Sequence, residues 1–123
     1  MLGLDLRSDD AAAEVARAAV AQVLAGSGMP PDRRHDAMLV TSELVTNAVR
    51  HGGAPVRLEV TTTPGRVLLR VYDTAATSPA PRPAGPDDEG GRGLLLVETL
   101  ASAWGCAPHQ DRPGKYVWAE LTW

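Results

Sequence analysis

The stretch SELVTNAVRHGG, from Ser42 to Gly53, places a glutamate four residues before an asparagine. An α-helix turns about 100° per residue, so Glu43 and Asn47 would lie about 40° apart on one helical face. The opposite arc is apolar and comprises Ala37, Met38, Leu44, Val45, Ala48 and Val49. The pattern predicts an amphipathic helix that runs from Pro31 to about His51 and stops at the two glycines.

The polar face of this helix has two interpretations. Asp36, Arg50 and His51 share the arc of Glu43 and Asn47, and such residues are ordinary on a solvated helix face. Asparagine, however, forms helices poorly, because its side chain competes for backbone hydrogen bonds. An amide oxygen can ligate Mg²⁺, and a nearby carboxylate can accept a proton from an attacking hydroxyl group. The pair alone therefore indicates either a solvated surface or the wall of a metal site.

The chain has 123 residues, of which 44% are hydrophobic and 22% are charged, which predicts one globular domain over residues 1–123. A net charge of -3 disfavours direct nucleic-acid binding, which usually needs a basic surface. The single cysteine, Cys106, excludes an intrachain disulfide and suits a reducing compartment. We find neither a signal peptide nor a membrane-spanning apolar run, so we expect a cytoplasmic protein without a membrane partner.

The segments around the central helix alternate between strand and helix patterns. Residues 2–6 alternate leucine with other residues and predict a short strand. An Ala-rich helix follows, with Ser8 or Asp9 as its N-cap and Gly26 as its stop. After the central helix, VRLEVT (56–61) and RVLLRVYD (66–73) predict a hairpin around the turn-forming pair Pro64-Gly65.

The end of the chain, KYVWAELTW (115–123), predicts a final strand with Val117, Ala119 and Leu121 pointing inward. Together, the expected elements are three helices and four or five strands in mixed order. We therefore expect an α+β fold, a two-layer α/β sandwich in which three helices pack on one face of a mixed, mostly antiparallel sheet.

The composition changes abruptly after residue 73. Residues 74–92, TAATSPAPRPAGPDDEGGR, hold four prolines and three glycines but no large apolar residue. This composition forbids a continuous helix or central strand and predicts a long loop, which in a small domain is either functional or disordered. An apolar helical pattern, GLLLVETLASAW, then begins at Gly93.

Gly90, Gly91 and Gly93 directly precede this last helix in the expected structure. Glycines let the backbone approach a ligand closely, and the unpaired N–H groups of a helix N-terminus favour phosphate. Arg92 could add a charge-assisted contact. A flexible linker before a helix gives the same pattern, so both interpretations stand. The segment matches neither G-x-x-x-x-G-K-[ST] nor a G-x-G-x-x-G after a strand, which disfavours the two commonest nucleotide-binding folds.

Asp73 ends the strand from which the long loop departs. A carboxylate at that place could accept a hydrogen bond from an exocyclic amine, such as the 6-amino group of adenine. An aspartate that only terminates a strand in a turn is the common alternative. The position is therefore a candidate for base recognition that needs support from its neighbours.

The order of these signals resembles the GHKL ATPase superfamily, whose nucleotide-binding domain is the Bergerat fold. The signals are E-x-x-x-N on a helix, a strand ending in aspartate, a long loop, and G-x-G-L before a helix. The resemblance covers nearly the whole chain. Among the members of this superfamily, the short single-domain form is similar to the anti-sigma factor serine/threonine kinases.

The resemblance implies a role for each matching residue. Asn47 would coordinate Mg²⁺ bound to the ATP triphosphate, Glu43 would act as general base, and Asp73 would read adenine. Residues 74–92 would form the ATP lid. The segment that would contact the phosphates consists of Gly91, Gly93 and Leu94, with Arg92 between the glycines.

One departure from the family pattern follows Asp73. The family's first glycine box usually reads D-x-G-x-G, whereas this chain reads DTAAT, with Ala75 and Thr77 at the glycine positions. A methyl group at Ala75 would crowd the backbone and penalise a positive φ. We therefore expect an altered adenine pocket and a low affinity for ATP.

The resemblance implies a protein serine/threonine kinase that uses ATP and Mg²⁺ to phosphorylate a small antagonist protein, an anti-anti-sigma factor. It also implies a sigma factor as a second partner, a homodimer, and a role in transcription regulation. The alternative is a module that binds nucleotide, or has lost it, and regulates a partner without phosphoryl transfer. A purely structural interaction domain is a third interpretation, which leaves the glycine and proline segments unexplained.

Overall fold

The computed structural model describes residues 1–75 and 89–123, and side chains are described outside 89–93. The described chain forms three helices and five strands in the order β1, α1, α2, β2, β3, α3, β4, β5. Their bounds are β1 Leu2–Leu6, α1 Ala12–Leu24, α2 Pro31–His51, β2 Val56–Thr63, β3 Arg66–Asp73, α3 Glu89–Leu100, β4 Ala103–Pro108 and β5 Lys115–Thr122.

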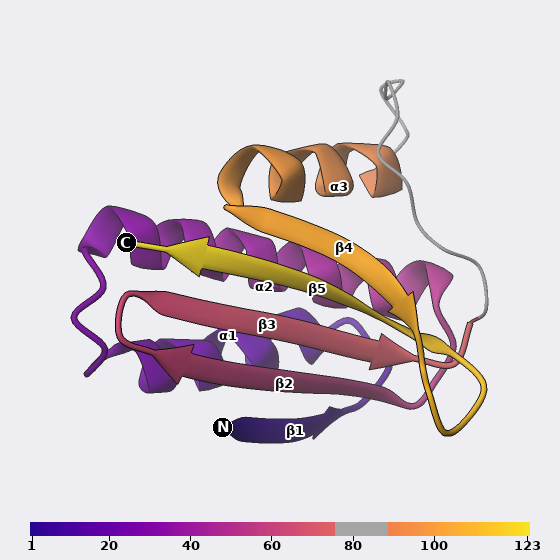
Figure 1. The fold of residues 1–123 in the computed structure, drawn as a ribbon. Helices are drawn as coiled ribbons and strands as arrows, with labels where there is room; N and C mark the ends of the chain where they lie inside the picture. Colours follow the sequence, from indigo (N-terminus) through magenta and orange to yellow (C-terminus); the bar gives the residue numbers. More distant parts are fainter. Residues whose placement is uncertain (76–88) are drawn as a thin grey trace.

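The strands form one five-stranded sheet in the order β1-β2-β3-β5-β4; α1 and α2 lie behind it, and α3 lies next to β4 at its edge (Figure 1). Each of the four pairings among the described strands is antiparallel. The expected two-layer α+β architecture is confirmed. We expected a mixed, mostly antiparallel sheet, and among the described strands every pairing is antiparallel.

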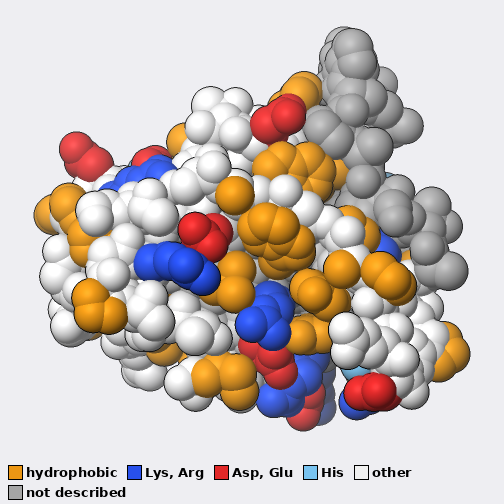
Figure 2. Space-filling model, viewed as in Figure 1, with side chains coloured by type: hydrophobic (Ala, Val, Ile, Leu, Met, Phe, Trp, Pro, Cys, Tyr) orange, Lys and Arg blue, Asp and Glu red, His pale blue; other side chains and the backbone are white. Residues whose placement is uncertain are grey.

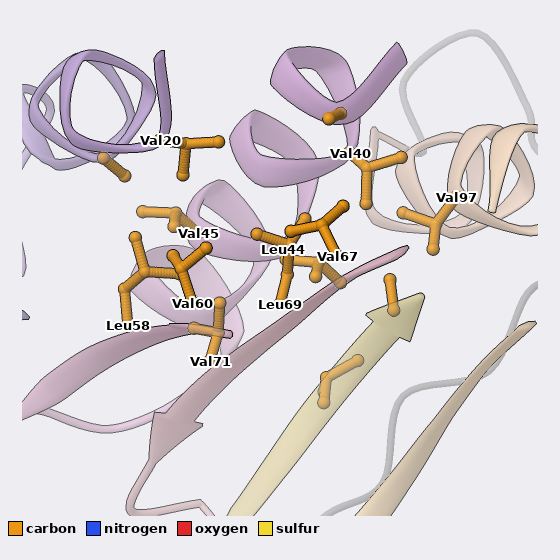
Figure 3. Close-up of a cluster of buried hydrophobic side chains, with 14 of the residues drawn as sticks. Val20, Val40, Leu44, Val45, Leu58, Val60, Val67, Leu69, Val71 and Val97 are labelled. Carbon is orange, nitrogen blue, oxygen red and sulfur yellow. The ribbon is translucent and has the colours of Figure 1, made fainter. Parts of the chain in front are cut away.

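The hydrophobic core fills the space between the sheet and the helices. Figure 3 shows Leu44 of α2 beside Val67 and Leu69 of β3, and Val45 of α2 beside Leu58 and Val60 of β2. Val20 of α1 and Val97 of α3 join the same cluster, and all these side chains are at most 2% exposed. All three helices therefore bury apolar surface against one face of the sheet, as the alternation in the strands predicts.

The central helix and the hairpin match their sequence patterns. Helix α2 has the expected bounds, with Pro31 in its first turn and Gly52 as its C-cap. Gly65 has a φ of 75°, the positive angle that a type II turn needs after Pro64. These two signals were local, so no tertiary contact was needed to predict them.

Helix α1 begins later than expected, at Ala12 with Ala11 as its N-cap. The carboxylate of Asp9 accepts a hydrogen bond from the backbone N–H of Ala11 at 3.0 Å, closing a local turn before the helix. Aspartate often forms such a turn because its side chain competes with helical hydrogen bonding.

The expected helix from Gly93 to Trp104 is wrong at both ends. Helix α3 ends at Leu100, and β4 takes up Ala103–Pro108. The strand was hidden in the sequence because small residues alternate with its two inward side chains, Trp104 and Cys106. Gly105 faces outward beneath Trp118, where an added Cβ would lie 2.9 Å from the indole nitrogen.

At its other end, α3 begins at Glu89, so Gly90, Gly91 and Gly93 lie within the helix rather than before it. Gly90 and Gly91 lie in its first turn, where the backbone N–H groups have no intrahelical partner, and Gly93 follows in the second turn. The expected lid, residues 74–92, is described only at Thr74 and Ala75 and in the start of α3. Residues 76–88 of this prediction lie outside the described residues.

Figure 2 views the sheet from the side opposite α1 and α2. Outward side chains of β3 and β5 place aromatic groups there, and the Tyr72 and Tyr116 rings have centroids 5.1 Å apart. Beside them, Arg57 pairs with Asp5 at 3.0 Å and with Glu59 at 3.3 Å. No described helix covers this face, and none in the described chain is long and apolar enough to cross a membrane.

Candidate functional site

Glu43 and Asn47 both lie on α2 and are half-buried. The polar arc that holds them faces α3, as the contacts at its other end show. Arg33 of α2 pairs with Asp36 at 3.0 Å and also donates to the carbonyl oxygen of Leu100, the last residue of α3, at 2.7 Å. The arc is therefore partly covered by α3 and is not a fully solvated helix face.

The same contact fixes the relative direction of the two helices. Since the end of α3 meets the start of α2, the start of α3 lies toward the C-terminal half of α2, which carries Asn47 (Figure 1). Leu94 is 3% exposed and anchors this part of α3 in the structure. Gly91, Arg92 and Gly93 belong to the first turns of α3, and their side-chain surroundings lie outside the described part.

Burial raises the pKa of Glu43 above its usual value, and the positive charge of Arg50 offsets part of this rise. A carboxylate with a raised pKa is a stronger base once ionised. Catalytic carboxylates are often tuned in this way by burial. The environment of Glu43 thus fits the role of a proton acceptor.

Asp73 is the last residue of β3, and its carboxylate has three hydrogen-bond contacts. Its carboxylate oxygens lie 2.8 and 2.9 Å from Nζ of Lys115, directly across the β3–β5 ladder. Oδ1 also accepts the backbone N–H of Ala75 at 2.9 Å. The side chains of Asp73 and Lys115 are 2% and 7% exposed, so this is a buried ion pair.

Two glycines pack closely against Asp73, one on its side chain and one on its backbone. A Cβ on Gly52, at the end of α2, would lie 2.5 Å from Oδ2 of Asp73. A Cβ on Gly114, where φ is 116°, would collide with the Asp73 carbonyl oxygen. The end of α2, the end of β3 and the start of β5 therefore meet at Asp73, and the two glycines permit this close approach.

The residues on α2 are close to this junction. A helix rises about 1.5 Å per residue, so Asn47 lies about 7.5 Å along the helix axis from Gly52. Thr74 extends the link, since its backbone N–H donates to the Gly53 carbonyl oxygen at 3.0 Å. The fold thus brings Asn47, Asp73 and the start of α3 to one end of the molecule (Figure 1).

Ala75 does not have the strain that the departure from the glycine box predicts. Among the described residues no residue other than glycine has a positive φ. The backbone of Ala75 is therefore not in the left-handed region, where its methyl group would be strained. Its N–H instead caps the Asp73 carboxylate. The expected backbone penalty at Ala75 is therefore wrong, whereas Thr77 lies outside the described residues.

Sequence reasoning missed Lys115 and misread Gly52. Lys115 was placed only in the final strand, although it is the single lysine of the chain and follows Gly114 directly. Gly52 was assigned only as a helix stop. Its backbone is extended, with φ -90° and ψ -168°, so a positive φ does not explain the glycine. The absence of a side chain matters because Asp73 approaches this position closely.

A magnesium ion would fit this donor set only together with phosphate. No group of three or more His, Cys, Asp or Glu side chains able to hold a metal occurs in the described part of the chain. Mg²⁺ commonly takes one or two protein oxygens and completes its shell with water and substrate phosphates. The amide oxygen of Asn47 suits such a site.

A pocket of about 490 Å³ lies on the opposite, outward face of the sheet and is lined in part by Arg57, Glu59, Tyr72 and His109. It shares Asp73 with the candidate site but none of Glu43, Asn47 and Leu94. Along β3 the Asp73 side chain lies on the same face as Val71, toward the helices. The candidate site is therefore the helix-side junction and not this pocket.

Comparison with known proteins identifies the class. The model of the histidine kinase-like ATPase domain matches residues 6–120, so the chain belongs to that family. This match confirms the resemblance to GHKL ATPases drawn from the sequence motifs. It spans every element of the candidate site, from α2 to β5.

Two individual proteins are similar to the chain. An uncharacterized protein of Streptomyces coelicolor, SCO4941, is 36% identical over 76 residues, which cover 58% of this chain and 72% of that protein. The crystal structure of the RsbU and RsbW domains of Rv1364c from Mycobacterium tuberculosis matches with a TM-score of 0.72 and 23% identity. That match covers 98% of this chain but 32% of the solved chain, and it supports the fold.

Proposed function

We propose that the protein binds ATP with Mg²⁺ at the junction of α2, β3 and α3 and acts as a regulatory serine/threonine kinase. The observation that carries this proposal is the meeting of Asp73 with the end of the helix that bears Glu43 and Asn47. Membership of the histidine kinase-like ATPase family supports the proposal that the bound nucleotide is ATP. Asp73 would then hold the base, and the phosphates would extend toward Asn47 and α3.

Asn47 would contribute its amide oxygen to the metal that the triphosphate carries. Mg²⁺ supplies neutralisation of the phosphate charge when it is bound. The first turn of α3, residues 89–92, contains Gly91 and offers backbone N–H groups that have no intrahelical partner and suit phosphate oxygens. Gly93 follows directly after this turn, and its missing side chain would let the phosphates approach closely. Arg92 and Leu94 complete the proposed phosphate segment, Arg92 by charge and Leu94 by anchoring the helix.

Glu43 would accept the proton of a serine hydroxyl on a protein substrate while its oxygen attacks the γ-phosphorus. A new phosphorus–oxygen bond forms, the bond to the bridging oxygen breaks, and ADP leaves. The raised pKa of Glu43 suits it to take the proton.

The proposed substrate is a small antagonist protein, and a sigma factor is the proposed second partner, as the resemblance to anti-sigma factor kinases implies. Such a protein would act in the cytoplasm as a homodimer and regulate transcription without binding DNA itself. These partners extend the family assignment and await direct tests.

A second candidate function is favoured by the ion pair itself. Lys115 already occupies Asp73, so a module that binds nucleotide weakly and controls a partner by binding alone is compatible with the site. Phosphoryl transfer separates the two candidates. The regulatory kinase must transfer labelled phosphate to a serine of its partner, whereas the binding module does not.

Isothermal titration with ATP and Mg²⁺ is the first test. We expect saturable heat at ATP concentrations below the millimolar range, and no heat up to millimolar ATP would contradict the proposal. A pull-down from native extract with and without ATP and Mg²⁺ would then supply the partner for the transfer assay. The exposed-helix variant His35→Ala serves as a control for nonspecific loss of binding.

A further inference from the structure

The Asp73 carboxylate has little capacity left for a ligand. A carboxylate offers about four acceptor positions. The N–H of Ala75 and the two contacts from Nζ of Lys115 use three of them. One position remains for the amino group of a base, and the next polar group that such a base meets is the Lys115 ammonium.

From this arrangement we infer that Lys115 is the second base-reading residue of the nucleotide site. Its ammonium would donate a hydrogen bond to ring nitrogen N1 of adenine, while the 6-amino group of the same base donates one to the Asp73 carboxylate. The inference rests on the proposed function, because it assigns a residue of the same site. It predicts that Lys115, and not only Asp73, determines which base is bound.

The hydrogen-bonding pattern of the pair matches the edge of the base. Nζ lies 2.8 and 2.9 Å from the carboxylate oxygens, and the 6-amino group and N1 of adenine lie side by side on one edge, both bonded to C6. Adenine presents a donor beside an acceptor there, and the ion pair presents an acceptor beside a donor. An ammonium has three N–H groups, so Lys115 keeps one beyond its two contacts with Asp73.

The burial of the two side chains would strengthen such a contact. Lys115 is 7% exposed and Asp73 is 2% exposed, so water competes little for hydrogen bonds at the pair. A hydrogen bond from a charged donor in a buried place is stronger than one between neutral groups.

A purely structural role explains the pair less well. A buried ion pair is often no more stabilising than apolar residues of similar volume. Here the carboxylate also requires Gly52, whose replacement would collide with the Asp73 side chain, and Gly114 lies against the Asp73 backbone. One glycine and the chain's only lysine are thus placed around one carboxylate.

The test compares three ligands by isothermal titration in the presence of Mg²⁺: ATP, 1-deaza-ATP and inorganic tripolyphosphate. The protein is tested as wild type, as Lys115→Met, and as Arg66→Met. Arg66→Met is the matched control, because it removes a cation at the other end of the β3–β5 pair, where the side chain is 55% exposed.

We expect wild type and Arg66→Met to bind 1-deaza-ATP at least about tenfold more weakly than ATP. We expect Lys115→Met to bind the two nucleotides within about twofold of each other. Equal affinities for the two nucleotides in wild type would overturn the inference and leave the proposed function intact. An unchanged preference in Lys115→Met would also overturn it, since another group would then read N1.

Tripolyphosphate separates failure of the inference from failure of the proposed function. If it binds as tightly as ATP, the site binds phosphate without reading the base, and both the inference and the proposed role of Asp73 are lost. If neither ATP nor tripolyphosphate binds, the proposed function is lost and the inference with it. Tighter binding of ATP than of tripolyphosphate is the result that both require.

A second measurement covers the case in which Lys115→Met does not fold. Because Lys115 is the only lysine, ¹⁵N-lysine labelling of wild type gives one side-chain ammonium signal. We expect ATP to shift this signal more than 1-deaza-ATP does when both are saturating. Equal shifts would overturn the inference without any variant.

Discussion

Asp73 and Lys115 face each other directly across the β3–β5 ladder, with both carboxylate oxygens within 2.9 Å of the ammonium nitrogen. The carboxylate that the family resemblance assigns to adenine is therefore already engaged by a charged partner. Recognition of a base at this place must include the lysine. The consequences for stability and binding can be measured separately.

The ion pair should be strongly coupled in its effect on stability. We expect Lys115→Met to cost about 3–5 kcal/mol, because it leaves a buried carboxylate without its partner. Asp73→Asn in the Lys115→Met background should recover much of this loss, since the uncompensated charge is then gone. Urea denaturation of wild type, both single variants and the double variant measures the coupling. Additive costs would contradict the buried pair.

Gly52→Ala should destabilise the protein and weaken ATP binding together. The added Cβ would lie 2.5 Å from the Asp73 carboxylate, so either α2 or Asp73 must shift. Overpacking of this kind typically costs about 1–3 kcal/mol. Gly26→Ala is the matched control, because nothing lies within 4 Å of its added Cβ. Thermal denaturation and ATP titration should show a loss in the first variant and almost none in the second.

Asn47→Ala should abolish the Mg²⁺-dependent part of ATP binding. The amide oxygen is the proposed protein ligand, and the half-buried position on α2 leaves the helix itself tolerant of alanine. ATP titration with Mg²⁺ and with EDTA, alongside His35→Ala from the same helix, measures this effect. Equal ATP affinity in wild type and Asn47→Ala would remove the metal assignment.

Glu43→Gln should keep ATP binding and lose phosphoryl transfer by about 10²-fold or more, the usual contribution of a positioned base. In wild type, transfer should rise with pH through a pKa above the usual glutamate value, because burial raises the pKa of Glu43. Transfer assays across pH with the purified partner measure both effects. Full activity in Glu43→Gln would refute the proposed base.

Glu43→Gln, which should lower phosphoryl transfer, should raise the stability of the fold. A carboxyl group whose pKa is raised on folding stabilises the folded state while it is protonated, and this contribution is lost as pH rises through the folded pKa. Glu43→Gln should therefore raise Tm slightly at neutral pH, with the difference shrinking toward about pH 4. A Tm difference that grows toward acid pH would contradict the raised pKa.

Much of the fold was predictable because its signals are local. The alternation of β2 and β3, the turn at Gly65 and the bounds of α2 each depend on a few neighbouring residues. Strand β4 was not predictable in this way. Its outward positions are small residues, and Trp104 and Cys106 gain their inward role only from pairing with β5. The sequence of α3 and β4 therefore read as one continuous helix.

The site was predictable in its members and not in its contacts. Glu43, Asn47 and Asp73 follow from residue types at a fixed spacing and from the family resemblance. Lys115 is 42 residues from Asp73, and only the register of β3 against β5 brings them together. Likewise, Gly52 resembles any helix stop until the position of Asp73 is known. Long-range pairing is the information that a single sequence lacks.

Arg33 binds the start of α2 to the distant end of α3 and to the sheet. It pairs with Asp36 and also donates to the carbonyl oxygen of Leu100, the hydroxyl of Ser102 and the carbonyl oxygen of Thr122. One guanidinium thus fastens α3 at the end away from Asn47 and Asp73. The last turn of α3 is therefore held by hydrogen bonds to one arginine, whereas its middle is held by the burial of Leu94 and Val97. A substitution of Arg33 should loosen the end of the helix that is far from Asn47 and leave the buried middle in place.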